Sequence, residues 1–428
     1  MTKLGIKKFL IPVFLIIILI GSIVGLNSYY LNTTQEVIDS KPYVGIAFCG
    51  KTTDEAKTQI DRTKNYTNLF ILDTGRSELS RNQTAVIEIC NYAVESGLNI
   101  IVNLGITSPY ENDTTTWFWD QPMSEIKKNW TERWGNQFLG VYYNDEPGGI
   151  QLDGYWVEFY EQHSDNFSKV EHPAIKSLQQ IYLKMLYHAE NKILPQDYDL
   201  EADFFVNYVL KEGDPGLAAL NAAGITTFTS DYGLYWFDYL GGYEVLLAQL
   251  GWNASVAQQI ALVKGAARLQ DKEWGTIITW KYGEPPFLDN GEQIYNQMLS
   301  SYQAGADYIV IFNYATLGNE SAPAMVEEHY LALERFWKDI HYKKQSNLST
   351  PEAVLILPSN YGWGMRHHDD TIWGFWPSDD KTEQIGTVMG KLLAIYGVTL
   401  DIVYEDARYP VSKMDYKQVY YWNTTIVR

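Results

Sequence analysis

The chain has 428 residues, of which 46% are hydrophobic and 14% aromatic, so it has ample material for a core and intrinsic disorder is excluded. Its 52 acidic and 33 basic residues give a formal net charge of −19. A protein that binds nucleic acid needs a basic face to contact phosphates, so this balance argues against such a partner. The length predicts about two or three domains.

The first residues predict a membrane anchor. Lys3, Lys7 and Lys8 precede an uncharged apolar run at residues 9–26, and about 18 apolar residues can cross the hydrocarbon core of a bilayer. Basic residues before such a run stay in the cytoplasm. We therefore expect residues 1–30 to form a single-pass signal anchor in the cell membrane, with the bulk of the chain extracellular. A cleaved signal peptide is the alternative, although the residues after the run fit a cleavage site poorly.

Glycosylation motifs support export independently of the anchor. The pattern Asn-x-Ser/Thr is expected about three times by chance in this composition. It begins at ten positions: Asn32, Asn65, Asn82, Asn112, Asn129, Asn166, Asn253, Asn319, Asn347 and Asn423. Only Cys49 and Cys90 are present, so the chain lacks the disulfide framework common in secreted eukaryotic domains. Many N-glycosylation motifs with few cysteines favour an archaeal cell surface.

Short apolar runs alternate with segments of helical spacing between residues 41 and 343. Eight of these runs predict strands, at residues 43–49, 68–73, 99–104, 138–143, 203–208, 226–230, 275–281 and 307–313. Segments with helical spacing, such as 84–95 and 256–269, lie between them. Eight strands alternating with helices predict an α/β chain whose main domain, residues 41–343, is a (β/α)₈ TIM barrel.

A second α/β unit is predicted after a polar linker at residues 343–351. Strands at 353–358, 400–404 and 418–422, with a helix at 383–396, indicate a small Rossmann-like domain over residues 351–428. The loop at residues 361–376 is rich in aromatic side chains, and we expect it to pack over the barrel mouth. Its adjacent His367, His368, Asp369 and Asp370 do not have the spacing of a zinc site. No metal and no cofactor is therefore expected.

The ends of the barrel strands are where catalytic side chains are expected, because active sites of such barrels lie at the carboxyl ends of the strands. Several carboxylates should meet there, and cleavage of a glycosidic bond needs one carboxyl group as an acid and usually a second beside it. The polar residues at these ends are Asp73, Asn103, Asn144, Asp145, Glu146, Asp231, Lys281, Tyr282, Glu284 and Asn313.

The segment Gly140-Val-Tyr-Tyr-Asn-Asp-Glu-Pro147 resembles the end of strand four in (β/α)₈ glycoside hydrolases. Clan A families of these enzymes have Asn-Glu-Pro at this place, and the resemblance implies that Glu146 is the general acid. Lys281 occupies the position on strand seven where those families carry a nucleophilic Glu. Glu284, three residues later, and Asp231 are the candidates for a second catalytic carboxylate.

The adjacent Asp145 and Glu146 also resemble a second group, the enzymes that cleave 2-acetamido sugars by substrate assistance. That resemblance implies that Asp145 orients the acetamido group while Glu146 protonates the leaving oxygen, and it needs no protein nucleophile. A barrel followed by a small α/β domain is similar in domain order to family 42 β-galactosidases. Both mechanisms remain open at this stage.

Aromatic residues crowd the loops on the same side of the barrel. Sugar rings stack on flat aromatic faces, so we expect sugar platforms among Trp117, Trp119, Trp236 and Trp280. The sequence therefore predicts a membrane-anchored extracellular glycoside hydrolase whose partners are an oligosaccharide or polysaccharide and, through the first helix, the membrane. A barrel that binds glycans or organises the cell envelope without catalysis is the alternative.

Overall fold

A computed structural model describes residues 42–73, 79, 82–103, 123–153, 197–212, 215–252, 254–315, 323–342 and 350–425. The predicted anchor at residues 1–30 and the two tryptophans Trp117 and Trp119 lie outside these residues. Among the residues described, no helix is both long and apolar enough to cross a membrane.

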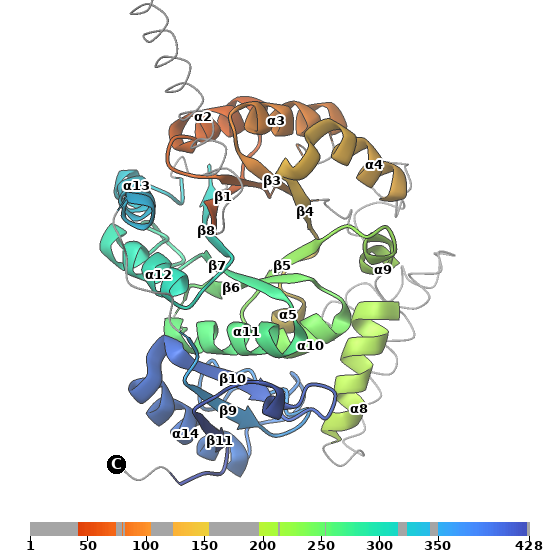
Figure 1. Cartoon of the computed structure of the whole chain (residues 1–428), viewed down its shortest axis with the longest axis vertical. Coiled ribbons are helices and arrows are strands. Elements are labelled where there is room, and N and C mark those ends of the chain that lie inside the picture. The colour runs from red at the N-terminus through yellow and green to blue at the C-terminus, as the bar shows by residue number, and fades with distance from the viewer. Residues whose placement is uncertain are drawn as a thin grey trace, which may run out of the picture. The chain divides into compact units, whose positions relative to one another are not determined.

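Eight parallel strands form a closed barrel in which β1 pairs with both β2 and β8 (Figure 1). The predicted (β/α)₈ barrel is thus confirmed. Its strands are β1 (Tyr43–Cys49), β2 (Leu69–Leu72), β3 (Asn99–Asn103), β4 (Phe138–Tyr142), β5 (Thr227–Asp231), β6 (Val245–Leu250), β7 (Glu273–Ile278) and β8 (Tyr308–Tyr314).

Helices follow or separate these strands. They are α2 (Thr53–Thr63), α3 (Gln83–Glu95), α4 (Met123–Trp134), α5 (Pro147–Asp153), α8 (Tyr198–Asp203), α9 (Pro215–Ala222), α10 (Tyr235–Gly241), α11 (Val256–Gln270), α12 (Gly291–Gln303) and α13 (Glu327–Tyr342), with a π-helical segment at Phe204–Glu212. Side-chain caps define several starts. Thr52 and Glu55 form a capping box at α2, and Asn290 caps α12, satisfying amides that have no partner inside the helix.

Two strand assignments from the sequence were wrong. Residues 203–208 are not a strand, because they belong to the end of α8 and to the π-helical segment. Their buried side chains follow helical spacing, with Phe205 and Val209 four residues apart. The strand that the sequence analysis missed is β6, so the predicted strand at 226–230 corresponds to β5 and not to the sixth strand.

Alternation along the strands decides which side chains face the barrel interior. The inner core contains Ala47, Leu69, Ile71, Ile101, Tyr142, Phe228, Val245, Leu247, Ile277, Tyr308 and Val310. Apolar neighbours of these residues along the strands, such as Ile46, Phe70 and Leu246, belong instead to the larger core between strands and helices. Because side chains alternate between the two faces of a strand, only every second residue at a strand end can point into the barrel mouth.

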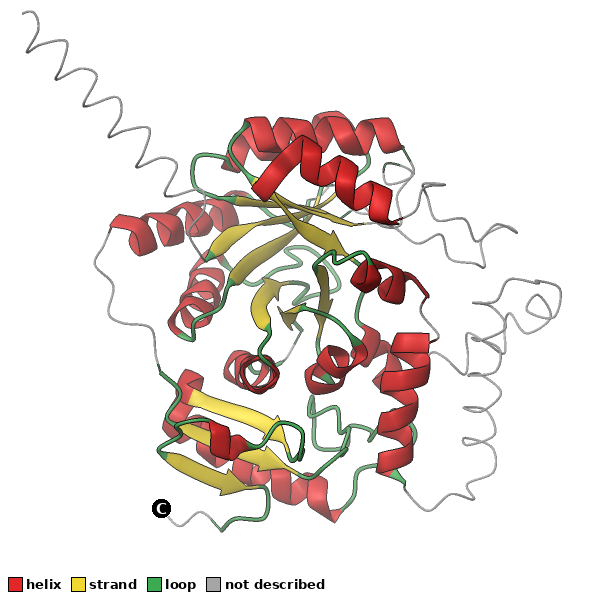
Figure 2. Ribbon diagram, turned by 45° about the vertical axis from the view of Figure 1, so that its right-hand side comes forward, coloured by secondary structure: helices red, strands yellow, loops and turns green. Residues whose placement is uncertain are grey.

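A second, three-stranded parallel sheet has the order β10-β9-β11, and we refer to residues 350–425 as the C-terminal unit (Figure 2). Its strands are β9 (Ala353–Leu357), β10 (Leu400–Tyr404) and β11 (Gln418–Tyr421), and its helix is α14 (Asp380–Tyr396). Short 3₁₀ turns lie at Gly135–Gln137, Gly397–Thr399 and Val411–Lys413.

The C-terminal unit packs against helix α11 of the barrel. A Cβ atom on Gly265 would lie only 2.5 Å from the carbonyl oxygen of Ile402, so the helix and β10 are in very close contact. Beside this contact, the buried Lys264 ammonium lies 3.0 Å from the buried Asp401 carboxylate. Arg268 also contacts Asp401 at 3.0 Å, and the Tyr416 hydroxyl donates to it at 2.7 Å. An ionic cluster therefore joins the barrel to the last part of the chain.

Candidate active site

The turn after β4 is conformationally strained. Asn144 and Glu146 have φ angles of 53° and 54°, in the left-handed region that costs a residue other than glycine about 1–3 kcal/mol. Two hydrogen bonds from β5 hold this turn. The Glu146 amide donates to the Ser230 carbonyl at 2.9 Å, and the Thr229 hydroxyl donates to the Asn144 carbonyl at 2.9 Å. Such strain is found mainly where function requires a particular side-chain position.

The Glu146 side chain is fixed by a residue that the sequence analysis missed. Gln249, on β6, donates from Nε2 to Glu146 Oε1 at 2.6 Å and to Ser230 Oγ at 2.9 Å. One oxygen of the Glu146 carboxyl group is therefore held by a side-chain amide. Gln249 is almost fully buried. The sequence signal was a single polar side chain within the apolar run of residues 245–250.

Asp145 lies in the same mouth and is held by two hydroxyl groups. Tyr142 OH donates to Asp145 Oδ1 at 2.6 Å, and Ser230 Oγ lies 2.9 Å from the same oxygen. Burial and the charge of Asp145 raise the pKa of Tyr142 well above its ordinary value, so the phenol keeps its proton and remains a donor. The Asp145 side chain is exposed to solvent, and it is thus oriented while still accessible to a ligand.

Asp73 and Asn103 form the neighbouring part of the mouth. Asn103 Nδ2 donates to Asp73 Oδ1 at 2.6 Å. Burial, with a further contribution from the charge of Asp145, raises the pKa of Asp73 to about 7. Burial, and then the charges of the same two carboxylates, raise the pKa of the adjacent Cys49 thiol, so Cys49 stays protonated at neutral pH and is a poor nucleophile. The ends of β1 to β4 therefore lie close to one another.

Asp231 faces away from the mouth, toward helix α5. Its two carboxylate oxygens accept hydrogen bonds from the amides of Gly148, Gly149, Tyr232 and Gly233 at 2.7 to 3.1 Å. Burial and then the charge of Glu146 raise the pKa of Asp231 to about 8, although these amides oppose the rise. The structure thus gives Asp231 a role in holding the backbone after Glu146, and its oxygens are not directed at a substrate.

Two other predicted binding residues also lie away from the mouth. Asn313 is buried between β8, α2 and α13, where it donates to Gln59 at 2.8 Å and accepts from the Met325 amide at 3.0 Å. Trp236 is only 3% exposed, and its ring packs against Tyr409 of the C-terminal unit with centroids 5.9 Å apart. Neither side chain is available to a sugar in this arrangement, because both are buried among other residues.

The loop after β7 presents the remaining candidates. Trp280 is half-buried, with its ring centroid 5.1 Å from that of Phe312, and Lys281 follows it, also half-buried. Tyr282 and Glu284 are exposed. Within the described residues, no hydrogen bond or ion pair joins the Glu284 carboxylate to Glu146 or Asp145.

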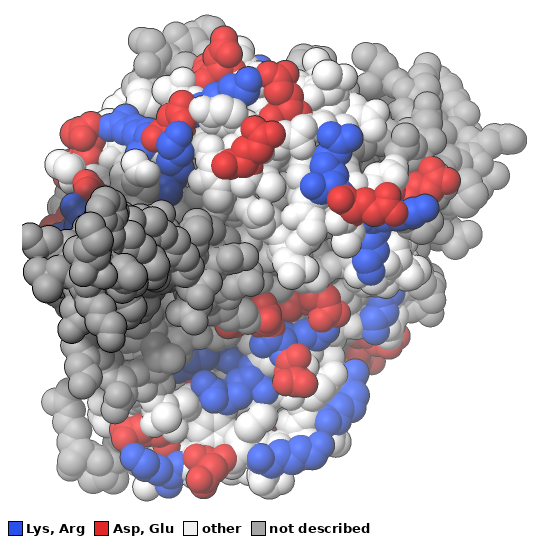
Figure 3. Space-filling view, turned by 45° about the horizontal axis from the view of Figure 1, so that its top comes forward, with Lys and Arg blue, Asp and Glu red and all other residues white. Residues whose placement is uncertain are grey.

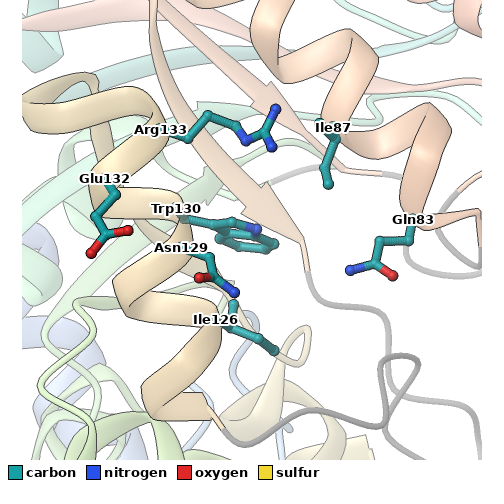
Figure 4. A pocket seen from close by; sticks show the side chains of 7 residues that line it. All are labelled: Gln83, Ile87, Ile126, Asn129, Trp130, Glu132 and Arg133. Carbon is teal, nitrogen blue, oxygen red and sulfur yellow. The ribbon is translucent and has the colours of Figure 1, made fainter.

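A hollow of about 510 Å³ lies outside the barrel, between α3 and α4 (Figure 4). It is lined by Gln83, Ile87, Ile126, Asn129, Trp130, Glu132 and Arg133. None of these residues belongs to the group at the strand ends. The described residues also contain no group of three or more His, Cys, Asp or Glu side chains that could hold a metal ion.

The closed (β/α)₈ barrel is the same fold as that of glycoside hydrolases of known structure, as the sequence resemblance implied. The chain is similar in structure to a β-galactosidase from the Antarctic haloarchaeon Halorubrum lacusprofundi, with a TM-score of 0.54 and 10% identity, over 85% of this chain and 66% of that enzyme. It is also similar to GH5_18 from Streptomyces cattleya, solved in complex with GlcNAc, with a TM-score of 0.51 and 11% identity, over 89% of this chain and 98% of that one. No protein-family model and no curated protein matches the sequence.

Proposed function

We propose that this protein is a glycoside hydrolase in which Glu146 is the general acid. The observation that carries the proposal is the strained turn at Asn144-Asp145-Glu146, held at the barrel mouth by Ser230 and Gln249. A carboxyl group at this place, oriented through one oxygen, can protonate the leaving oxygen of a glycosidic bond.

Asp145 supports substrate assistance as the mechanism. Tyr142 and Ser230 hold its carboxylate as an oriented acceptor beside Glu146, which suits a hydrogen bond from the N–H of a 2-acetamido group. The acetamido oxygen then attacks the anomeric carbon as Glu146 donates its proton, and water later opens the resulting ring. Among the described residues no hydrogen bond holds the Glu284 carboxylate beside Glu146, and Asp231 is turned toward α5, so neither is oriented as a protein nucleophile. The GH5_18 neighbour, whose structure contains GlcNAc, binds a sugar of this class.

Three variants of the full chain test the catalytic assignment. Glu146→Gln keeps the shape and removes the proton. It should lower turnover of glycosides with poor leaving groups by about 10²- to 10⁴-fold, with a smaller loss for activated aryl glycosides. Asp145→Asn should abolish most cleavage of 2-acetamido substrates, and Glu284→Gln serves as the matched control. If Glu284→Gln causes the largest loss instead, a protein nucleophile replaces substrate assistance.

The glycosidase proposal itself fails if the wild-type chain hydrolyses none of a broad panel of glycosides. Retained oligosaccharide binding in both the wild type and Glu146→Gln would then establish a non-catalytic glycan-binding barrel. Acidic and basic side chains are interspersed on the face of the described residues shown in Figure 3.

We propose further that the protein is anchored in the membrane of an archaeal cell, with the barrel outside, where it acts on cell-surface or environmental glycans. The four asparagines of glycosylation motifs within the described residues, Asn65, Asn82, Asn129 and Asn423, are all exposed, as glycan acceptors must be. Protease added to intact cells should remove a barrel epitope, and mass spectrometry of the released peptides should detect glycans. An epitope that survives on intact cells but is lost after lysis would exclude this location.

A further inference from the structure

Helix α5 begins directly after Glu146, so whatever fixes this helix also fixes the proposed acid. At its start, the amides of Gly148 and Gly149 donate to Asp231 at 2.7 and 2.9 Å. Close packing leaves no space beside these glycines. A Cβ atom on Gly149 would lie 2.2 Å from Cζ of Tyr232. The first turn of α5 is therefore pressed against the loop that follows β5.

The end of α5 is held by an arginine from the C-terminal unit. Arg366 Nη1 donates to Asp153 Oδ1 at 2.6 Å, and Tyr232 OH donates to the second oxygen, Asp153 Oδ2, at 2.5 Å. Only about a quarter of the Arg366 and Asp153 side chains is exposed, with values of 23% and 26%. A charge-assisted hydrogen bond with this degree of burial is stronger than a bond between solvated surface charges.

Arg366 is itself held in one position. Its Nε and Nη2 atoms donate to the two oxygens of Asp370 at 2.9 and 2.8 Å. The Asp370 side chain is 2% exposed, and a Cβ atom on Gly364 would lie 2.1 Å from its Oδ2 atom. The guanidinium group is also 5.3 Å from the centre of the Tyr232 ring. Because Arg366 is fixed in this way, a shift of its loop would also shift Asp153, to which it is bonded.

The loop that contains Arg366 contacts helix α5 at further points. Gln151 Nε2 donates to the Trp373 carbonyl at 3.0 Å, and the Thr371 hydroxyl donates to the Leu152 carbonyl at 3.1 Å. Gly374 has a φ of 75°, and a Cβ atom there would lie 2.2 Å from the Gln151 carbonyl oxygen. The aromatic loop of the C-terminal unit is therefore docked along α5, which differs from the predicted place over the barrel mouth.

The arginine is close enough to Glu146 to affect its position. Asp153 follows Glu146 by seven positions, which corresponds to about 10 Å along a helix. Tyr232, which bonds Asp153, lies two residues after Ser230, whose carbonyl accepts a hydrogen bond from the Glu146 amide at 2.9 Å. Two side chains, Asp153 and Tyr232, thus connect Arg366 to the segment that holds the Glu146 turn.

We propose that Arg366 is a positioning residue for Glu146, so that the C-terminal unit completes the active site without touching the substrate. This inference rests on the proposed glycosidase function. The bond from Arg366 to Asp153 fixes the end of helix α5. Through this helix it also fixes the direction of the Glu146 carboxyl group, which directly precedes α5.

Arg366→Met tests the proposal in the full chain, and Arg335→Met is the matched control. Arg335 also bonds a carboxylate, Glu292, at 2.7 Å and lies 3.9 Å from a tyrosine ring, that of Tyr295, but on helices α12 and α13. Arg366→Met should lower kcat for poor leaving groups by about 10- to 100-fold, since a displacement near 1 Å can cost that much. It should lower kcat for activated aryl glycosides less and leave KM unchanged, and Arg366→Lys should recover part of the loss.

Amide hydrogen exchange provides a measurement that does not depend on activity. Arg366→Met should speed exchange at residues 146–153 relative to the wild type, whereas Arg335→Met should not. If the wild type is inactive but exchange changes as described, the glycosidase proposal fails and the positioning of the turn by Arg366 stands. Unchanged exchange at residues 146–153, or an equal loss of kcat for all leaving groups, overturns the positioning role.

Discussion

Gly149→Ala is a small change with a large expected effect. The added Cβ atom would lie 2.2 Å from Cζ of Tyr232, whereas ordinary contacts of such an atom begin at 3.4 Å. The difference, 3.4 minus 2.2, means that α5 and the ring must separate by about 1.2 Å. Tyr232 cannot simply turn aside, because its hydroxyl bonds Asp153 at 2.5 Å. Either the helix that starts after Glu146 moves or this bond breaks.

The expected cost follows from this displacement. Overpacking of this kind lowers the free energy of unfolding by about 1–3 kcal/mol, and a misplacement of about 1 Å lowers turnover by up to about 10²-fold. Turnover of a glycoside with a poor leaving group measures the second effect, and thermal unfolding of the same sample measures the first. Activity should fall much more than the fraction of folded protein at the assay temperature.

Gly390→Ala is the matched control for this prediction. Gly390 lies in helix α14, and a Cβ atom there would meet nothing within 4 Å. Alanine is the better helix former, so this change should raise the free energy of unfolding by about 0.5–1 kcal/mol and leave turnover unchanged. The reasoning about α5 is refuted if Gly149→Ala unfolds at the wild-type temperature and turns over substrate at the wild-type rate.

Three other changes test separate parts of the structure. Gln249→Leu removes the donor that orients the Glu146 carboxyl group, and because a misplaced catalytic group can cost up to about 10²-fold, kcat should fall by about 10- to 100-fold in steady-state assays. Asp73→Asn should flatten the pH dependence of thermal stability. The raised pKa of Asp73, about 7, makes the native state bind more protons than the unfolded state, so the wild type loses stability as pH rises from about 4 to about 7. Asp401→Leu leaves the buried Lys264 ammonium without its carboxylate and should cost about 3–5 kcal/mol in denaturant unfolding.

Each of these three expectations has a contradicting result. Wild-type kcat for Gln249→Leu would mean that Glu146 is oriented by other groups. An unchanged slope of unfolding temperature against pH in Asp73→Asn would mean that Asp73 is ionised throughout. For the ionic cluster, the double variant Lys264→Met with Asp401→Leu should regain much of the stability lost by Asp401→Leu, because the uncompensated charge is gone. A double variant no more stable than the single one would contradict this.

The sequence was sufficient for the barrel but not for every strand. Buried parallel strands are short apolar runs, and these cannot be distinguished from buried helical segments by periodicity alone. That ambiguity explains why residues 203–208, with the buried pair Phe204 and Phe205, were taken as a strand. It also explains why β6 was missed. The aromatic helix α10 ends only a few residues before β6, so the two elements form one nearly continuous apolar stretch.

Residues of the candidate site could be predicted where they belong to a sequence motif. They could not be predicted where the direction of the side chain depends on strand register. Asp145 and Glu146 were found from their place after β4. Asp231 and Asn313 were assigned to the mouth because they end their strands, but a shift of one residue in a strand exchanges inside for outside, and both point outward. The role of Arg366 could not be foreseen, since it depends on contacts between residues 213 positions apart.

The ionic cluster on α11 also has a consequence for how the chain is made. Asp401 follows Lys264 by 137 residues, the difference of their positions, and at synthesis rates of about 5–20 residues per second this interval lasts about 7–27 s. During this interval Asp401, the carboxylate that contacts the Lys264 ammonium group in the folded protein, has not yet been synthesised. The buried lysine of helix α11 therefore gains its carboxylate partner only after strand β10 has been translated.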